Sequence, residues 1–296
     1  MQTQGLSLPS YAKVNLSLRV LGRRADGFHD VVTILQTISL HDALTFEPLD
    51  KGIELSCEDS NVPLDETNLI IRAAIALQHE FRTGVGARID LKKQIPIGGG
   101  LGGGSSNAAA TLIGLSRLWS LDVSFERLCR IASGLGSDVP FFLHGGTALA
   151  VGTGTAITQM PDVDLGPMIV VAPNVKVSTR EAYEALEAVS LTTGDSERIL
   201  LNYHIDMVEP LEAGNDFEKT VFAAFPEIAS VKATLLEFGA KEALMSGSGA
   251  SVFGIFENKE TRQTALEALG ERTDWRSFAV AAVSRTEYRE KLGLAD

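Results

Sequence analysis

The chain has 296 residues, of which 45% are hydrophobic and 22% are charged, and its formal net charge is −12 at pH 7. This composition predicts a soluble globular protein of two ordinary domains or one large one, and it excludes disordered and collagen-like chains. The negative charge repels phosphate backbones, which excludes a general nucleic-acid-binding protein but leaves room for a local cationic pocket that holds one small anion.

The start of the chain and its cysteines favour the cytoplasm. The segment MQTQGLSLPSYAK lacks the basic and apolar regions of a signal peptide, and no stretch approaches the about 20 apolar residues that span a bilayer. Two cysteines, Cys57 and Cys129, cannot form a disulfide framework, so we expect two reduced thiols. We therefore expect a cytoplasmic monomer or homodimer with no membrane or nucleic-acid partner.

The first predicted element is a strand over residues 12–20. Its aliphatic residues, from Val14 to Val20, alternate with polar ones, and this period of two is typical of a strand with one buried face. Lys13 and Asn15 share the other face, so we expect both side chains to point away from the core. Lys13 then has no obvious local partner.

Further strands and helices follow up to residue 160. A turn is predicted at Asp26-Gly27, and Asn68 and Ser124 are candidate N-caps of two helices. A third helix is expected after a glycine-rich loop, and GSDVPFF opens a short segment. The predicted strands cover residues 31–40, 53–57 and 87–93.

The composition changes near residues 161–167, so we predict two domains, residues 1–163 and residues 164–296. In the second domain the patterns predict strand, helices, two strands, helix and strand, and these elements make an α+β fold with an antiparallel sheet. The predicted strands are 168–172, 242–245, 252–256 and 278–284. The predicted helices are 178–189, 216–225, 226–238 and 261–271.

Glycines are concentrated in one loop. Six of the seven residues from Gly98 to Gly104 are glycine, between a predicted strand and a helix expected to begin at Ser105-Ser106-Asn107. Glycines let backbone N–H groups approach an anion, and a helix N-terminus adds unpaired donors and partial positive charge. The loop therefore predicts a phosphate cradle, and the alternative is a flexible linker.

Two common nucleotide motifs fit this loop poorly. The spacing of Gly98, Gly100 and Gly103 matches a dinucleotide fingerprint, but any run of glycines does so, and the preceding strand alternates whereas Rossmann strands are continuously apolar. A Walker A loop needs Gly-Lys, which the chain lacks. Lys92 and Lys93 precede the loop instead, where one of them can neutralise phosphate charge from the side.

Asp138, in the segment GSDVP, is a candidate catalytic acid or base. An aspartate on such a turn is commonly only a helix cap, but small residues flank this one and the apolar pair Phe141-Phe142 follows it. Phosphoryl transfer to an alcohol needs positioning, charge stabilisation and a proton acceptor. A carboxylate can accept the proton, and a lysine such as Lys13 would keep it ionised and stabilise developing charge. The sequence leaves open whether the two side chains meet.

Three segments read together resemble a known family. AKVNLSLRVLGRRADGFHD, PIGGGLGGGSSNAAA and SGSGASVFGIF occur in the order and spacing of the GHMP kinases, and the resemblance covers nearly the whole chain. The doubled glycine loop and GRRADGFHD are most similar to the 4-diphosphocytidyl-2-C-methyl-D-erythritol kinases of non-mevalonate isoprenoid biosynthesis. The resemblance implies two α+β domains with the active site in the cleft between them.

The resemblance also implies an ATP-dependent kinase. Lys13 and Asp138 match the family's catalytic pair, with Asp138 as the base for the 2-hydroxyl of the erythritol and Lys13 as the electrostatic stabiliser. Mg²⁺ is expected on the ATP phosphates, with Ser106 as a candidate contact and no dedicated metal site. The ATP-binding residues implied are Asn68, Leu69, Lys93, Pro96, Ile97, Gly98, Gly99, Gly100, Leu101, Gly102, Gly103, Gly104, Ser105, Ser106 and Asn107.

A second set of residues matches the family's substrate site. Phe28 stands where the family usually has Tyr, so a ring remains to stack on cytosine but a hydroxyl is lost. His29 is expected to recognise an edge of the cytosine base. Tyr183 is expected to cover the face of the base opposite Phe28. Residues 215–218, NDFE, resemble a family segment that usually has Leu in place of Phe. The substrate-binding residues implied are Asn15, Phe28, His29, Thr179 and Tyr183.

Several alternatives remain at this point. SGSGAS is either a plain tight turn or a turn near the phosphates or the substrate. Rival functions are a related kinase with another alcohol acceptor, an NAD(P)-dependent oxidoreductase and a catalytically silent nucleotide sensor, for which Lys13 and Asp138 would lie far apart. The other histidines show no metal-ligand spacing; they are His41, His79, His144 and His204.

Overall fold

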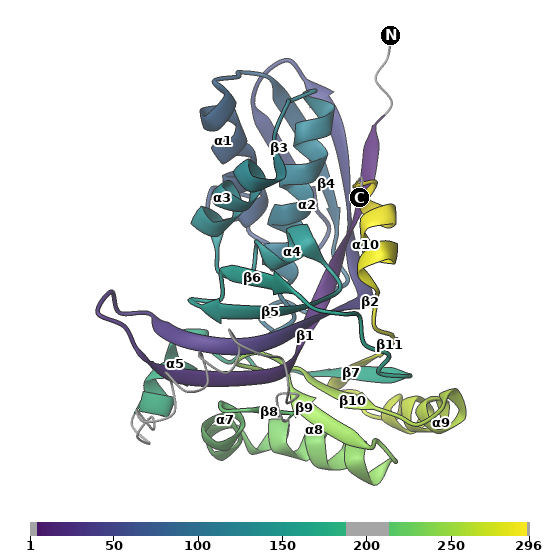
Figure 1. Cartoon of the computed structure of the whole chain (residues 1–296). Coiled ribbons are helices and arrows are strands. Elements are labelled where there is room, and N and C mark those ends of the chain that lie inside the picture. The colour runs from purple at the N-terminus through teal and green to yellow at the C-terminus, as the bar shows by residue number, and fades with distance from the viewer. Residues whose placement is uncertain (1–4, 188–212, 295–296) are drawn as a thin grey trace.

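The computed structural model describes residues 5–187 and 213–294, which form two sheets with helices packed on them (Figure 1). The predicted α+β class is confirmed. Residues 1–4, residues 188–189 of the predicted helix 178–189, and His204 lie outside the described residues. Within the described ranges no helix is long and apolar enough to cross a membrane. The division between residues 163 and 164 stays a prediction.

A long hairpin forms the centre of the first sheet. β1 (Leu6–Arg23) pairs with β2 (His29–Leu49), and the predicted turn between them is confirmed. β2 is longer than the predicted strand 31–40 because its first half pairs with β5 (Thr147–Gly152) and its second half with β4 (Gly86–Lys92). The hairpin therefore connects the two ends of the sheet, and its tip projects from the body of the molecule (Figure 1).

The prediction that β1 has one exposed face is wrong. Its aliphatic face packs on the second sheet, where Val14 meets Val170 and Phe253 in one cluster. Its polar face is buried as well, since the glycine loop and the SGSG turn cover it, and Lys13 and Asn15 are each 3% exposed. The alternation of apolar and polar residues along a strand does not reveal whether its polar face is covered by other parts of the chain.

Most other elements of the first half begin where their capping residues predict. α1 (Leu69–Phe81) has Asn68 as its N-cap and α3 (Phe125–Leu135) has Ser124, and both side chains accept a backbone N–H. α2 (Gly103–Leu118) begins two residues before the predicted Ser105, because Gly102 serves as its N-cap in the left-handed conformation. The remaining elements are β3 (Ile53–Cys57), α4 (Phe141–His144) and β6 (Ala156–Gln159).

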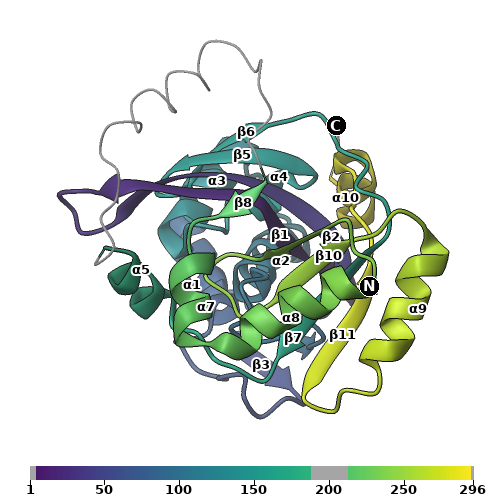
Figure 2. The ribbon, with the colours of Figure 1, turned by 90° about the horizontal axis from the view of Figure 1, so that it is seen from below.

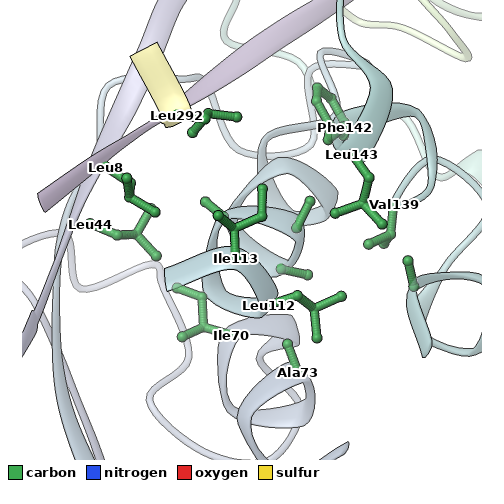
Figure 3. Packing of buried hydrophobic residues seen from close by; sticks show 14 of the residues in the cluster. Leu8, Leu44, Ile70, Ala73, Leu112, Ile113, Val139, Phe142, Leu143 and Leu292 are labelled. Carbon is green, nitrogen blue, oxygen red and sulfur yellow. The ribbon is translucent and has the colours of Figure 1, made fainter. Parts of the chain in front are cut away.

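Helices α1 to α4 pack on this sheet around the first core. Alanines on α2 allow the helix to approach the sheet closely, and the cluster includes side chains from both ends of the chain (Figure 3). The labelled members are Leu8, Leu44, Ile70, Ala73, Leu112, Ile113, Val139, Phe142, Leu143 and Leu292.

The second sheet is antiparallel throughout, in the order β11-β7-β10-β9. Helices α7, α8 and α9 cover its outer face (Figure 2). The predicted strands and helices of this half are confirmed in kind, with shifted ends, and α5 (Thr179–Glu187) lies beside the hairpin (Figure 1). Their bounds are β7 Met168–Pro173, α7 Glu218–Ala224, α8 Pro226–Glu237, β9 Glu242–Met245, β10 Val252–Ile255, α9 Lys259–Leu269 and β11 Trp275–Val280.

Two late segments return to the first sheet and were not predicted. β8 (Gly214–Asn215) pairs in parallel with β1. α10 (Arg285–Leu292) buries Tyr288 and Leu292 in the first core. The sequence of α10 is mostly charged and has only these two buried anchors, so its hydrophobic pattern is too sparse to indicate a helix.

Candidate active site

Two pockets meet at the glycine loop. The first has a volume of about 370 Å³, and the loop itself and the start of α1 line it. The second, of about 810 Å³, lies between the hairpin, α5 and the turns at Asp138 and Gly247. Gly100, Gly102 and Ser105 line both pockets. A molecule in one pocket can therefore reach a molecule in the other across the loop.

The loop has a backbone that only glycine adopts easily. Gly98, Gly100 and Gly102 have φ angles of 70°, 75° and 70°, in the left-handed region. A Cβ on Gly100 would overlap the carbonyl oxygen of Ser246, and one on Gly102 would lie 2.8 Å from the ring of Phe142. The first turn of α2 follows directly, so its free N–H groups face the same space as the loop amides.

Lys13 and Asp138 meet where the pockets join. Lys13 Nζ lies 3.5 Å from Asp138 Oδ2, and the two side chains are 4% and 37% exposed. Contrary to expectation, Lys13 has a local partner: its Nζ donates to Asn15 Oδ1 at 2.7 Å, and Asn15 in turn donates to Thr33 Oγ1 at 2.8 Å. The ammonium is thus held in place, while the carboxylate is open to the larger pocket.

Aromatic side chains form one wall of the larger pocket. The rings of His29 and Tyr183 stack, with centroids 4.5 Å apart and 21° between planes. Tyr183 also packs edge-to-face on Phe217 at 4.8 Å. Phe28 lines the pocket and is 61% exposed, which is unusual for a phenylalanine and leaves its ring available to a ligand. Thr179, also on this wall, has its Oγ1 2.9 Å from Ser248 Oγ.

The environment of Tyr183 is apolar and lies close to a carboxylate. Burial, reinforced by the negative charge of Asp138, raises the pKa of the Tyr183 hydroxyl to about 12 from 10.0. Both causes disfavour the phenolate, so the ring stays neutral over the ordinary working range of pH. A neutral ring suits stacking on an uncharged base.

This shift predicts a loss of stability at alkaline pH. In the unfolded chain Tyr183 ionises near pH 10.0, whereas in the folded chain it ionises near pH 12. The unfolded state therefore releases its proton first, and the stabilisation present below pH 10 is lost as the pH rises. Relative to Tyr183→Phe, the free energy of unfolding should fall by about 1 kcal/mol by pH 11. Urea denaturation of both proteins from pH 8 to pH 11 measures this, and parallel curves would contradict it.

Lys93 lines the smaller pocket, but its charge is already neutralised. Its Nζ lies 2.7 Å from Asp42 Oδ2 and 2.7 Å from the carbonyl oxygen of Ile95. Burial lowers the pKa of Lys93, and the neighbouring Asp42 partly opposes this effect. Its ammonium is thus directed at Asp42 and Ile95, and Lys92, on the exposed side of β4, does not line the pocket. The main positively polarised groups that the loop offers to the pocket are therefore its backbone N–H groups.

Asp42 is a buried carboxylate that the sequence analysis missed. It is 0% exposed and accepts from Lys93, from the backbone N–H groups of Gln94 and Ile95, and from Asn107 Nδ2 at 2.9 Å. It joins β2, the chain entering the loop and the first turn of α2. Its position in a strand of mixed polarity gave no sign of this function.

Removing this carboxylate should destabilise the fold. In Asp42→Ala the Lys93 ammonium stays buried without a counter-charge, which costs about 3–5 kcal/mol. In Asp42→Ala combined with Lys93→Met the buried charge is gone, so part of that loss should be recovered. Urea unfolding of the parent, the single variants and the double variant measures both effects. A single variant as stable as the parent would contradict the prediction.

The other residues predicted for the ATP site differ in whether they line the smaller pocket and in what their side chains bind. Asn68 caps α1 and, with Leu69, lines the smaller pocket. Asn107 lines it too, but its amide is engaged by Asp42 and Ser10. Ser106 does not line the pocket: it is 1% exposed, and its hydroxyl accepts from Ser10 Oγ at 2.8 Å. All other residues predicted for the ATP site line this pocket.

The SGSG turn lies directly against the glycine loop. Ser246 Oγ donates to the carbonyl oxygen of Gly100 at 2.9 Å, and the backbone N–H of Ser251 donates to Gly99 at 3.1 Å. Gly247 and Ser248 line the larger pocket. Of the two readings of this motif, the structure favours the one in which it borders the site.

Other lining residues were not singled out from the sequence. Residues 61–63 and Thr67 border the smaller pocket, and Arg23, Thr33, Ser137, Thr153 and Arg180 border the larger one. They come from turns and strand ends whose meeting depends on tertiary structure. Among residues 5–187 and 213–294, no group of three or more His, Cys, Asp or Glu side chains could hold a metal ion.

The chain matches two family models. The model for the GHMP kinases N terminal domain matches residues 68–146, and the model for GHMP kinases C terminal matches residues 201–274. The first match begins at the N-cap of α1 and ends after α4, so it contains the glycine loop and Asp138.

Curated proteins and solved structures give similar results. The 4-diphosphocytidyl-2-C-methyl-D-erythritol kinases of Syntrophus aciditrophicus and Solibacter usitatus are each 41% identical, over 94% and 97% of this chain and 99% and 92% of their own lengths. A crystal structure titled 4-(cytidine 5'-diphospho)-2C-methyl-D-erythritol kinase superposes with a TM-score of 0.76 at 34% identity, covering 94% of this chain and 99% of that one. A homoserine kinase from Cytophaga hutchinsonii, 19% identical with a TM-score of 0.70 and 97% of both chains covered, shares the fold.

Proposed function

Because this chain belongs to the GHMP kinase family, and within it to the 4-diphosphocytidyl-2-C-methyl-D-erythritol kinases, we propose that it phosphorylates the 2-hydroxyl of that compound with ATP. One observation carries the proposal. Lys13 and Asp138 lie 3.5 Å apart at the point where two pockets meet across a glycine loop. This adjacency also argues against a silent nucleotide sensor.

The smaller pocket is the proposed ATP site. The amides of the loop and the first turn of α2 supply donors for the phosphates without requiring a lysine from the loop itself. Mg²⁺ would be carried on the phosphates as part of the substrate and would neutralise their charge. The γ-phosphoryl group would then lie above Gly100 and Gly102, which face both pockets.

The larger pocket is the proposed acceptor site. Its volume of about 810 Å³ is within the range of sites that bind a small molecule. The exposed ring of Phe28 and the His29–Tyr183 stack offer aromatic surface for cytosine. Arg23 and Arg180 line the same pocket and match the negative charge of a diphosphate.

The proposed transfer follows from the positions of these groups. The acceptor oxygen attacks the γ-phosphorus, the bond from that phosphorus to the bridging oxygen breaks, and ADP leaves. Asp138, open to the pocket, takes the hydroxyl proton, and Lys13, held by Asn15, stabilises the negative charge.

The direct test is ADP release by the purified chain with 4-diphosphocytidyl-2-C-methyl-D-erythritol, mevalonate or homoserine as acceptor. We expect turnover with the first alone, and we expect cytidine nucleotides to inhibit competitively with respect to it. Absence of turnover by folded protein would contradict the specific acceptor. Turnover of another alcohol without inhibition by cytidine nucleotides would assign the chain to a different acceptor within the family. We further propose that the enzyme acts in the cytoplasm.

A further inference from the structure

The segment Asn215–Glu218 is not accounted for by the proposed reaction, although the sequence singles it out. It begins in β8, the short strand that pairs with β1, and leads into α7. It therefore lies between the strand that carries Lys13 and the SGSG turn that borders the glycine loop. Its side chains make hydrogen bonds to both.

Asn215 uses both of its amide hydrogens and its carbonyl oxygen in hydrogen bonds to the backbone. Its side chain is buried, with 7% of the residue exposed. Nδ2 donates to the carbonyl oxygens of Met245 and Gly247, each at 2.7 Å, and Oδ1 accepts from the backbone N–H of Phe217 at 3.0 Å. The two carbonyls flank Ser246, so one amide group fixes the backbone on both sides of that residue.

The flanking acidic residues fix the same region from either side. Asp216 accepts from the backbone N–H of Val20 at 2.8 Å and from Arg19 at 3.0 Å, which ties the segment to β1. Glu218 accepts from the backbone N–H of Met245 at 2.9 Å. Met245 is therefore held through its N–H by Glu218 and through its carbonyl by Asn215.

Ser246 connects the backbone of residues 245–247 to the glycine loop. The Ser246 hydroxyl donates to Gly100, and its carbonyl oxygen lies against the Cα of Gly100 so closely that no Cβ fits between them. Gly247 lies beside Lys13, since a Cβ built on it would be 3.5 Å from Lys13 Nζ. A shift of residues 245–247 would therefore move the loop relative to the lysine.

We propose that Asn215 is a positioning residue for phosphoryl transfer, which acts by holding residues 245–247 against Gly100. This inference rests on the proposed function and deepens it. Asn215 lines neither pocket, so it touches no substrate. Its effect should therefore appear in the transfer step rather than in capture of the acceptor.

Asn215→Asp is the informative variant. The carboxylate has the same size and still accepts from Phe217, so the aromatic wall beneath Tyr183 keeps its support. The ionised carboxylate cannot donate, and the protonated form has a single O–H where the amide has two N–H donors. At least one of the two bonds to Met245 and Gly247 is therefore lost without a cavity.

We expect kcat to fall about 10²-fold, because a displacement near 1 Å at a transfer site has an effect of that size, while the acceptor KM changes less than threefold. Hydrogen–deuterium exchange should increase in peptides that cover Gly99 and Gly100. The control is Asn258→Ala, which removes the N-cap of α9 in an exposed position and leaves the loop untouched. It should lower Tm without changing kcat or loop exchange.

Three results would overturn the inference. They are a folded Asn215→Asp protein with kcat within threefold of the parent, loop exchange equal to the parent, or an effect on kcat that Asn258→Ala reproduces at equal Tm. If Asn215→Asp does not fold, Ser246→Ala breaks the same connection from the loop side and must give the same kcat loss and loop exchange. If the parent itself does not turn over the cytidylated acceptor, the proposed function fails, and loop exchange still decides this inference.

Discussion

Replacing Asp138 by asparagine is expected to lower kcat by a factor of about 10²–10⁴, the usual contribution of a positioned general base. Asparagine has the same shape, and Lys13 keeps its hydrogen bond to Asn15, so the pocket and its binding groups remain. It cannot take up the proton of the attacking hydroxyl, and it removes the negative charge 3.5 Å from Lys13 Nζ. Steady-state ADP release at saturating ATP and acceptor measures the loss in kcat.

The matched control is Asp122→Asn, which makes the same exchange at an exposed aspartate between α2 and α3, away from the glycine loop. It should keep the parent's kcat. Because Asp138→Asn also leaves the buried ammonium of Lys13 without its carboxylate partner, the free energy of unfolding is measured for both variants, and kcat is compared on folded protein. An Asp138→Asn enzyme with kcat within threefold of the parent would exclude Asp138 as the base.

The elements that the sequence predicted well are those with a local physical cause. Asn68 and Ser124 satisfy free N–H groups at the start of a helix, and each stands just before the segment predicted to form α1 or α3. The glycine loop could be recognised because a run of glycines between a strand and a helix has few structural uses. The resemblance to the GHMP kinases then indicated that Lys13 and Asp138 lie together. Patterns within two distant segments of the sequence could not show this.

What the sequence did not predict depends on contacts made after folding. Lys13 appeared exposed because the residues that cover it, from the glycine loop and the SGSG turn, come from distant parts of the chain. Asp42 appeared to be an ordinary strand residue because its four donors come from the segment after β4 and from α2. Lys93 appeared available to phosphate for the same reason. A buried charge is recognised only when its partner is known.

The site therefore has two kinds of polar group with different constraints. Asp138 and the loop amides are open to the pockets and can contact substrate. Asp42 and Asn215 are buried and hold backbone in place, and Ser10 holds the side chains of Ser106 and Asn107, where an unmatched donor or acceptor would be costly. These buried groups lie behind the glycine loop, so the shape of the proposed phosphate site depends on residues that line neither pocket.

Gly100→Ala is expected to have the second large effect, a loss of about 10²-fold in kcat/KM together with a lower Tm. Two costs combine at this position. The φ angle of 75° is in the left-handed region, which costs an L-residue about 1–2 kcal/mol. The new methyl group would also overlap the carbonyl oxygen of Ser246, and Asn215 holds the backbone on both sides of that residue, so the loop has to move instead.

Gly98→Ala separates these two costs. Gly98 has a φ of 70°, and a Cβ there meets nothing within 4 Å, so this variant has the backbone strain without the overlap. Both variants should lose Tm, but Gly100→Ala should lose far more kcat/KM, since only there must the loop shift away from Lys13 and Asp138. Thermal unfolding and ADP-release kinetics of the pair test the argument. Equal losses in kcat/KM would mean that the loop tolerates movement at Gly100, and that its contact with the SGSG turn does not set the geometry of transfer.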